Sequence, residues 1–321
     1  MDRLLGVAIL LVLTGVLIAS NIYTLIPIYH EVSTDISSSI NRTVLGSSIF
    51  TLFYAIGLLT FGPLSEIVGR KKVLVNGLLF SAFTTIIVGL ASNVSSLYLT
   101  RGLQGFALAS FAPVAFAYTF ELFSAKKRTM VLALINSGFL VAGIVGQLLS
   151  IVITTAYSWN YVFFLFGSIY FLLFLISLNV LPATALLHKQ DNRIIKDMRK
   201  LLTHTELVKC YAITFTLLLS FVAFYDGLGR YFTQEQAIDQ DNLLIIRAIG
   251  LIGACLSLFT GKIIRRVGEE STLMVGICLA LCSLGILLFI TTPTSIAILS
   301  VFFVAAISLL IPAIISLIAP A

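Results

Sequence analysis

The chain has 321 residues, of which 59% are hydrophobic and 11% are charged, and its formal net charge is +6. A soluble domain usually has about a quarter of its residues charged, so this composition excludes a water-soluble fold. It indicates a chain whose solvent is lipid, where each backbone segment must satisfy its own hydrogen bonds, as helices do. No stretch alternates between apolar and polar residues as a strand would. The fold class that we expect is therefore an all-α integral membrane bundle.

Ten apolar stretches are long enough to cross a bilayer, because a helix needs about 20 residues to span about 30 Å of hydrocarbon. We predict a helix in each of the ranges 4–28, 43–61, 73–91, 97–120, 130–155, 161–182, 208–228, 242–260, 272–290 and 296–318. The first range exceeds the apolar run of a signal peptide, which is usually about 7 to 15 residues. It is therefore expected to be retained as a helix.

The loops between these segments differ in charge. Most of the 20 basic residues lie in the amino terminus and in every second loop, and Lys and Arg mark the cytoplasmic side. The sequence thus predicts a multi-pass plasma or inner membrane protein with a cytoplasmic amino terminus. Aromatic residues at the edges of the opposite loops indicate an interfacial belt: Tyr29, Tyr98, Tyr157, Trp159, Tyr161 and Tyr231. Topology accounts for the net charge, so nothing favours a nucleic-acid partner.

The longest loop divides the chain into two related parts. We expect a six-helix bundle at 1–182, a cytoplasmic amphipathic linker at 183–207 and a partial bundle of four helices at 208–321. The linker joins the bundles at the inner leaflet, and a regulatory or lipid-sensing role for it stays open. The segment from Gly62 to Gly69 recurs, displaced by 199 residues, between Gly261 and Gly268. Many carriers are built from such parallel repeats, with the solute site near the midplane where the halves meet.

The loop after the second segment resembles a signature of the major facilitator superfamily, which reads G-x-L-x-D-[RK]-x-G-[RK]-[RK]-x-x-L. Glu66 takes the place of the aspartate and Ile67 departs from the basic position, while the remaining positions match: Gly62, Leu64, Gly69, Arg70, Lys71 and Leu74. The resemblance implies an inner-gate salt network of Glu66, Arg70, Glu121 and Arg128. Each such pair is weak if it is hydrated, and charges that merely cap helix ends remain the alternative.

The fourth segment carries Leu97-x-x-x-Arg101-x-x-Gln104-Gly105, which resembles a second signature of the same superfamily. An arginine within lipid is costly and should face a partner or a wet cavity. The resemblance implies that Arg101 takes part in proton handling or holds its helix against the substrate path, with Gly105 as a packing position. The alternative is that Arg101 extends its side chain to the outer interface.

The fifth segment has a stripe of small residues, which lets helix backbones approach closely. The stripe consists of Gly138, Ala142, Gly146 and Ser150. It partly resembles the motif of the antiporter branch, and generic helix packing is the alternative. Gly253, Ser257 and Gly261 have the same spacing in the eighth segment, and the resemblance implies a contact between the fifth and eighth helices.

Polar residues within apolar segments are candidates for the lining of a substrate cavity, because lipid would otherwise exclude them. These candidates are Asn21, Tyr23, Gln104, Asn136 and Tyr225. Asp226 is a candidate proton acceptor. Alternatively, it forms a structural ion pair with Arg247 near the outer ends of their helices, or it is a solvated residue at a helix end.

These patterns together predict a secondary active transporter that exports a small molecule, drug or metabolite, by alternating access in exchange for protons. An uptake permease driven by proton symport and an inactive or regulatory membrane protein are the alternatives. We expect no enzyme activity, no metal and no cofactor, with the proton gradient as energy source, and a monomer in the lipid bilayer. Superfamily members normally have twelve helices, so the chain is expected to be truncated after the tenth.

Overall fold

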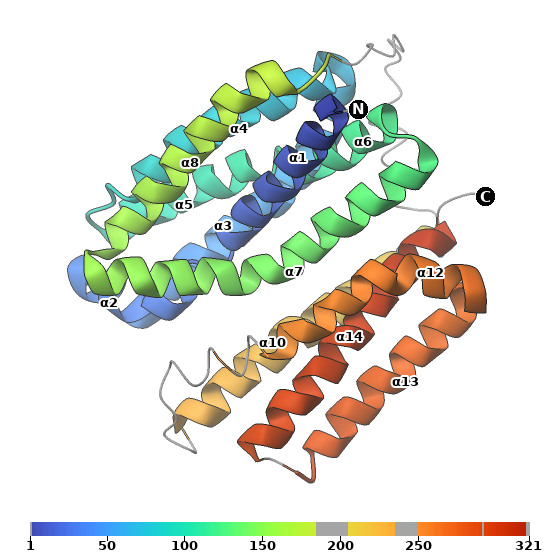
Figure 1. Ribbon diagram of the computed structural model, residues 1–321. Helices are drawn as coiled ribbons and strands as arrows, with labels where there is room; N and C mark the ends of the chain where they lie inside the picture. The colour runs from blue at the N-terminus through green and yellow to red at the C-terminus, as the bar shows by residue number, and fades with distance from the viewer. Residues whose placement is uncertain (1, 184–204, 235–244, 246–248, 291, 319–321) are drawn as a thin grey trace. The chain divides into compact units, whose positions relative to one another are not determined.

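The computed structural model describes residues 2–183, 205–234, 245, 249–290 and 292–318, and every regular element in those ranges is a helix (Figure 1). The predicted all-α membrane bundle is thus confirmed. The α-helices are α1 Asp2–Ser20, α2 Tyr29–Asp35, α3 Ile40–Val68, α4 Arg70–Val88, α5 Val94–Leu108, α6 Ala112–Leu122, α7 Ala125–Ala156, α8 Trp159–Val180, α10 Thr205–Gln234, α12 Ser257–Val267, α13 Glu269–Leu287 and α14 Pro293–Ile318. Two 3₁₀ helices accompany them, η1 Ile26–Ile28 and η2 Leu251–Leu256.

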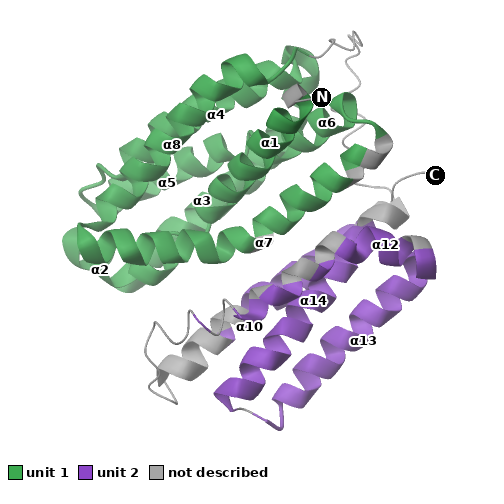
Figure 2. Ribbon diagram, viewed as in Figure 1, with its two compact units in different colours: residues 1–190 green, residues 191–321 purple. Residues whose placement is uncertain are grey.

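The chain divides into two compact units, Met1–Gln190 and Asp191–Ala321 (Figure 2). The division falls inside the predicted linker 183–207, most of which lies outside the described residues. Unit 1 holds α1 to α8, and unit 2 holds α10 to α14. Each unit is therefore described by itself.

Several helices are long and apolar enough to cross a membrane. Among the described residues six helices meet both conditions, or seven if the bent pair Met130–Phe139 and Val141–Ala156 is one span. Each of the ten predicted segments overlaps a described helix, so the chain is a multi-pass membrane protein. The first, seventh and eighth segments are among those whose helices are broken, shorter in their apolar part or only partly described.

The first predicted helix does not run unbroken from 4 to 28. α1 ends at Ser20, a tight turn follows with bonds such as Asn21 N–H to the Ile18 carbonyl, and η1 begins at Ile26. Pro27 has no N–H to donate, and it disfavours helical geometry in the residue before it. The Asn21 side chain also donates to the Leu17 carbonyl, 3.3 Å away. The break therefore places a polar residue and the carbonyl end of a helix inside unit 1.

The fourth predicted helix is also divided. α5 ends at Leu108 and α6 starts at Ala112, with Pro113 in its first turn. Proline cannot donate the hydrogen bond that would continue the helix, so the span from Val94 to Leu122 is kinked there.

Helices in unit 1 pack at glycines. α3 packs mainly on α5, α4 on α8, and α1 on α7 (Figure 1). A Cβ atom at Gly105 would lie 2.2 Å from the Phe50 carbonyl oxygen, and one at Gly146 would lie 2.3 Å from that of Ser20. No larger residue fits these crossings without moving a backbone.

The internal repeat is visible in the helix bounds. α3 ends at Val68 and α12 at Val267, while α4 begins at Arg70 and α13 at Glu269, so both boundaries are displaced by 199 residues. The residues between these helices are Gly69 and Gly268, with φ of 103° and 90°. This left-handed conformation is strained for any residue with a Cβ, which explains a glycine in both copies.

Candidate functional site

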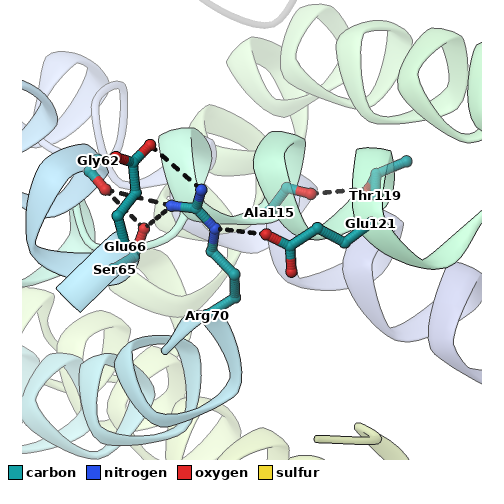
Figure 3. A network of polar contacts seen from close by, with 7 residues as sticks. All are labelled: Gly62, Ser65, Glu66, Arg70, Ala115, Thr119 and Glu121. Atoms are coloured by element: carbon teal, nitrogen blue, oxygen red, sulfur yellow. Dashed lines mark hydrogen bonds and ion pairs between the residues drawn. The ribbon is translucent and has the colours of Figure 1, made fainter. Parts of the chain in front are cut away.

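A polar network centred on Arg70 joins three helix ends of unit 1, those of α3, α4 and α6 (Figure 3). Arg70 Nε donates to Glu121 Oε1 at 3.1 Å, and its Nη2 donates to Glu66 Oε1 at 3.3 Å. Its Nη1 donates to the Gly62 carbonyl at 3.3 Å and to the Ser65 hydroxyl. The arginine thus binds two carboxylates and two neutral acceptors at once.

The exposed fractions within this network differ. The Arg70 side chain is 12% exposed and that of Glu121 is 24% exposed, whereas that of Glu66 is 56% exposed. Charge pairs are worth more where water is excluded. The contact from Arg70 to Glu121 is therefore the stronger of the two ion pairs.

Two predicted members of the gate motif lie elsewhere. Arg128 has its guanidinium carbon 4.6 Å from the centre of the Phe120 ring, and both ion pairs found among the described residues belong to Arg70. Lys71 Nζ donates to the Leu178 carbonyl at 3.0 Å, near the end of α8, where a cation is favourable for the helix dipole. Ser65 is a network member that the sequence did not single out, because serine is common near helix ends.

The second copy of this loop has the opposite charge pattern. Arg265 and Glu269 are displaced by 199 residues from Glu66 and Arg70, so acid and base are exchanged. The side chain of Arg265 lies outside the described residues. The spacing of four residues is kept in both copies, with the first residue in the last turn of one helix and the second at the start of the next.

A second polar network lies in the interior of unit 1, around Arg101 on α5. Arg101 is 0% exposed, its Nη1 donates to Gln104 Oε1 at 2.6 Å, and its Nη2 donates to the Asn21 carbonyl at 3.4 Å. The guanidinium carbon lies 4.2 Å from the centre of the Phe50 ring and 5.8 Å from that of Phe163. The side chain does not reach an interface, so the alternative of an arginine extended to the outer surface is excluded.

Asn21, at the break after α1, holds this network to neighbouring helices. Its Oδ1 accepts from Gln104 Nε2 at 2.9 Å, and its Nδ2 donates to the Tyr170 hydroxyl. Tyr170 donates to the Leu17 carbonyl at 2.8 Å, and Gln104 also donates to the Thr85 hydroxyl at 3.1 Å. Asn21 and Gln104 have no exposed surface and take part in this network, and their predicted place in the lining of a substrate cavity stays a prediction.

The end of α1 compensates the charge of Arg101. The last carbonyls of a helix have no partner within it and carry a partial negative charge. Those of Leu17 and Asn21 accept side-chain hydrogen bonds at the break. A helix terminus together with aromatic rings therefore takes the place that a carboxylate would otherwise hold.

The other predicted cavity residues either lie in unit 1 or have side chains outside the described part of the structure. Tyr23 and Asn136 are partly buried, and the Tyr23 ring lies about van der Waals distance from where a Cβ on Gly143 would be. The side chains of Tyr225 and Asp226 on α10 lie outside the described residues, as does Arg247. Tyr54 stacks on Phe50, the ring beneath Arg101. The sequence did not single it out, because nothing distinguishes it there from other aromatic residues of apolar helices.

The glycine stripe of α7 is used within unit 1. A Cβ on Gly138 would lie 2.9 Å from a Val16 methyl of α1, and Gly146 faces Ser20 of the same helix. In unit 2, Gly253 faces the Val301 carbonyl of α14. These glycines therefore pack against helices of their own unit, and the contact expected between the fifth and eighth segments stays a prediction.

Trp159, which the sequence places in an interfacial aromatic belt, is buried within unit 1. It is 3% exposed, and its Nε1 donates to Asp35 Oδ2 at 2.8 Å, linking the start of α8 to the end of α2. Tyr157 and Tyr161 are 75% and 54% exposed, as belt residues would be. A buried Trp N–H needs an acceptor, and Asp35 supplies one, so the indole can be buried here.

The described residues contain no cluster of side chains that could bind a metal ion. No group of three or more His, Cys, Asp or Glu side chains there is placed to hold an ion. Cys278 and Cys282 are exposed free thiols on α13. The polar groups that the structure brings together are thus those of the Arg70 and Arg101 networks.

Known proteins resemble this chain over most of its length. The family model of the Major Facilitator Superfamily matches residues 11–320. An uncharacterized transporter of Buchnera aphidicola is 28% identical over 250 residues, which are 75% of this chain and 60% of that protein. The multidrug resistance protein MdtG of Proteus mirabilis is 25% identical over 286 residues, which are 85% of this chain and 68% of MdtG. The inner membrane transport protein YnfM of Escherichia coli is 30% identical over 139 residues, 43% of this chain and 33% of YnfM.

The match with the first of these relatives spans about three fifths of that relative's length. The family model, in contrast, covers nearly all of the present chain, including both copies of the glycine loop and the Arg101 motif. Family members are transporters and not enzymes, in agreement with the absence of a catalytic set that the sequence predicts. The chain belongs to the Major Facilitator Superfamily.

Proposed function

We propose that the chain is a secondary active transporter that exports small amphipathic compounds, drugs or metabolites, across the plasma membrane in exchange for protons. Family membership supports a carrier that works by alternating access. The name of MdtG, a multidrug resistance protein, supports export by that relative and favours export here. The proposal includes a cytoplasmic amino terminus and a monomeric carrier.

The observation that carries the proposal is the Arg70 network (Figure 3). Arg70 joins the ends of three helices through two ion pairs of 3.1 and 3.3 Å. Partly hydrated ion pairs are worth about 0 to 1 kcal/mol each, so thermal motion can break and restore them in every cycle. A multi-helix contact of this strength suits a gate that opens and closes repeatedly.

Proton coupling is the finer part of the proposal. Asp226 is the one carboxylate in the predicted apolar segments, and a membrane-embedded acid is the usual carrier of a transported proton. Arg101 and Arg247 are proposed as the other membrane-embedded charges that take part in proton coupling. Tyr23, Asn136 and Tyr225 are proposed as solute contacts.

The test uses everted membrane vesicles that contain residues 1–321 and a trapped pH-sensitive dye. Adding a transported compound to vesicles with an acidic lumen should dissipate the pH gradient, because protons leave as the compound enters. D226N should abolish proton movement, whereas D239N, in a predicted loop, should leave it unchanged. Compound uptake without proton movement would remove the coupling, and uptake into right-side-out vesicles only would favour the permease instead.

A further inference from the structure

The membrane-crossing part of the sequence is poor in acidic side chains. The six predicted segments of residues 1–182 contain no Asp or Glu, and their one charged residue is Arg101. The segments of the second half add Asp226 and Arg247, one of each sign, and Lys209 at a cytoplasmic edge. The embedded segments thus have an excess of positive charge.

The charge of Arg101 stays positive and unpaired with any carboxylate in the described part of unit 1. A guanidinium remains protonated in proteins, and both ion pairs found among the described residues belong to Arg70. A helix terminus supplies only about half an elementary charge. A positive potential therefore extends from this side chain into its low-dielectric surroundings.

The free hydrogen-bonding capacity near Arg101 includes a buried donor. Its Nε has no hydrogen-bond partner although the atom is buried. Phe50 lies under the guanidinium, and Tyr54 stacks on Phe50 with ring centroids 5.9 Å apart and an interplanar angle of 11°. Tyr54 and Tyr23 are partly buried, and each has a phenol hydroxyl that can donate a hydrogen bond. An unpartnered N–H and two phenols favour a solute that accepts hydrogen bonds.

We propose that the transported solute carries no positive charge and is an uncharged or anionic amphipathic compound with hydrogen-bond acceptors. This inference deepens the proposed transport function and rests on it. A permanent organic cation would lose its hydration in the membrane, find no carboxylate in the segments of unit 1, and be repelled by Arg101. An anion would instead be attracted by Arg101, and a neutral acceptor could accept a hydrogen bond from a free donor such as Nε.

The test compares two ions of the same shape and opposite charge, tetraphenylborate and tetraphenylphosphonium. Radiolabelled forms are equilibrated with the chain in phosphatidylcholine nanodiscs, and binding to empty nanodiscs is subtracted. Tetraphenylborate should bind at least about tenfold more tightly, which corresponds to about 1.4 kcal/mol. Equal binding, tighter binding of the phosphonium or binding of neither ion would overturn the proposal.

Two variants test whether the Arg101 charge is the cause. R101Q should reduce the ratio of the two affinities toward one, whereas R101K, which keeps the charge but loses the flat stack on Phe50, should retain most of it. The wild-type comparison decides the proposal even if a variant fails to fold. An unchanged ratio in well-folded R101Q would assign the preference to another group and remove Arg101 from the argument.

A growth assay separates this inference from the function on which it depends. Cells without their major exporters are given the chain and exposed to quaternary ammonium, neutral and carboxylate-bearing inhibitors. Protection against the neutral or acidic compounds alone supports the inference, and protection against the cations contradicts it. No protection against any compound counts against export itself, whatever the ratio measured in nanodiscs.

Discussion

Arg101 has no exposed surface, yet it is stabilised without a carboxylate among the described residues. Placing an arginine in the centre of a membrane helix costs about 2.5 to 3.5 kcal/mol on insertion scales. Hydrogen bonds to a charged group return about 1.5 to 3 kcal/mol each, and a ring under a cation returns about 0.5 to 2 kcal/mol. Gln104, the Asn21 carbonyl and Phe50 therefore suffice to offset the cost.

The first prediction concerns the Tyr170 hydroxyl. Replacing Tyr170 with Phe removes the bond to the Leu17 carbonyl and leaves Asn21 Nδ2 without its side-chain acceptor. Loss of such buried bonds should cost about 1 to 3 kcal/mol, measured as a lower melting temperature in detergent. Tyr161→Phe is the matched control, because Tyr161 is 54% exposed and its change should stay within about 0.5 kcal/mol. Equal effects of the two changes would contradict the role of the network.

Part of this network could be predicted from the sequence and part could not. Asn21, Arg101 and Gln104 are conspicuous because polar residues are rare in apolar segments. Phe50 and Tyr170 are not, since rings are common there and their contacts cross between helices far apart in the chain. The break after Ser20, which supplies the carbonyls, was also missed, because residues 21–28 are apolar enough to continue a helix.

At the scale of elements, close crossings decide how tightly unit 1 packs. Gly105→Ala would place a Cβ 2.2 Å from the Phe50 carbonyl oxygen, so α3 and α5 would have to move apart. Such overpacking costs about 1 to 3 kcal/mol. We expect the melting temperature to fall by at least about 2 °C, at about 2 to 4 °C per kcal/mol.

The control for this change is Gly285→Ala on α13. Nothing lies within 4 Å of the position that its Cβ would take, and alanine is favoured over glycine in a helix by about 1 kcal/mol. The melting temperature should therefore stay the same or rise. A fall as large as that of Gly105→Ala would contradict the explanation by the crossing, because position 285 has neither a clash nor a loss of helix propensity.

The Arg70 network links helix ends unequally, and this leads to another prediction. Glu121→Gln removes the charge of the more sheltered partner, and Glu66→Gln removes that of the 56% exposed one. We expect the first to weaken the attachment of α6 by about 1 kcal/mol and the second to have less than half that effect. Unfolding in detergent at low salt measures both, and high salt should reduce the difference.

The element positions follow from the sequence better than the element breaks do. The ten segments predicted from apolar length all overlap described helices, and six or seven of these helices are long and apolar enough to cross a membrane. The division between α5 and α6 depends on Pro113, and proline is tolerated in many membrane helices. Its effect is set by neighbouring helices, which the sequence does not reveal.

At the scale of the whole molecule, the loop between α3 and α4 recurs between α12 and α13 with the same backbone geometry but with different charges. Helix boundaries and the left-handed glycines, Gly69 and Gly268, recur after 199 residues. The charges at the loop are reversed, Glu66 and Arg70 against Arg265 and Glu269. The turn requires glycine in both copies, whereas either order of charges allows a pair four residues apart.

Membrane topology gives a prediction at this scale. Single cysteines placed at Lys72 and Lys189, in a background without native cysteines, should react with an impermeant thiol reagent from the same side of the membrane. A cysteine at Ser92 should react from the other side. Both positions are in basic loops, which are predicted to lie on the cytoplasmic side. Labelling of positions 72 and 189 from opposite faces would therefore contradict the predicted topology.

Trp159 is the chain's single tryptophan, and its indole is buried and bonded to Asp35. Intrinsic indole fluorescence therefore comes from one known place, the junction of α2 and α8, and requires no attached dye. Asp35→Asn should shift that emission without altering the tyrosine signal. Any solute, lipid or pH change that loosens this junction becomes visible in an ordinary spectrum of the unmodified protein.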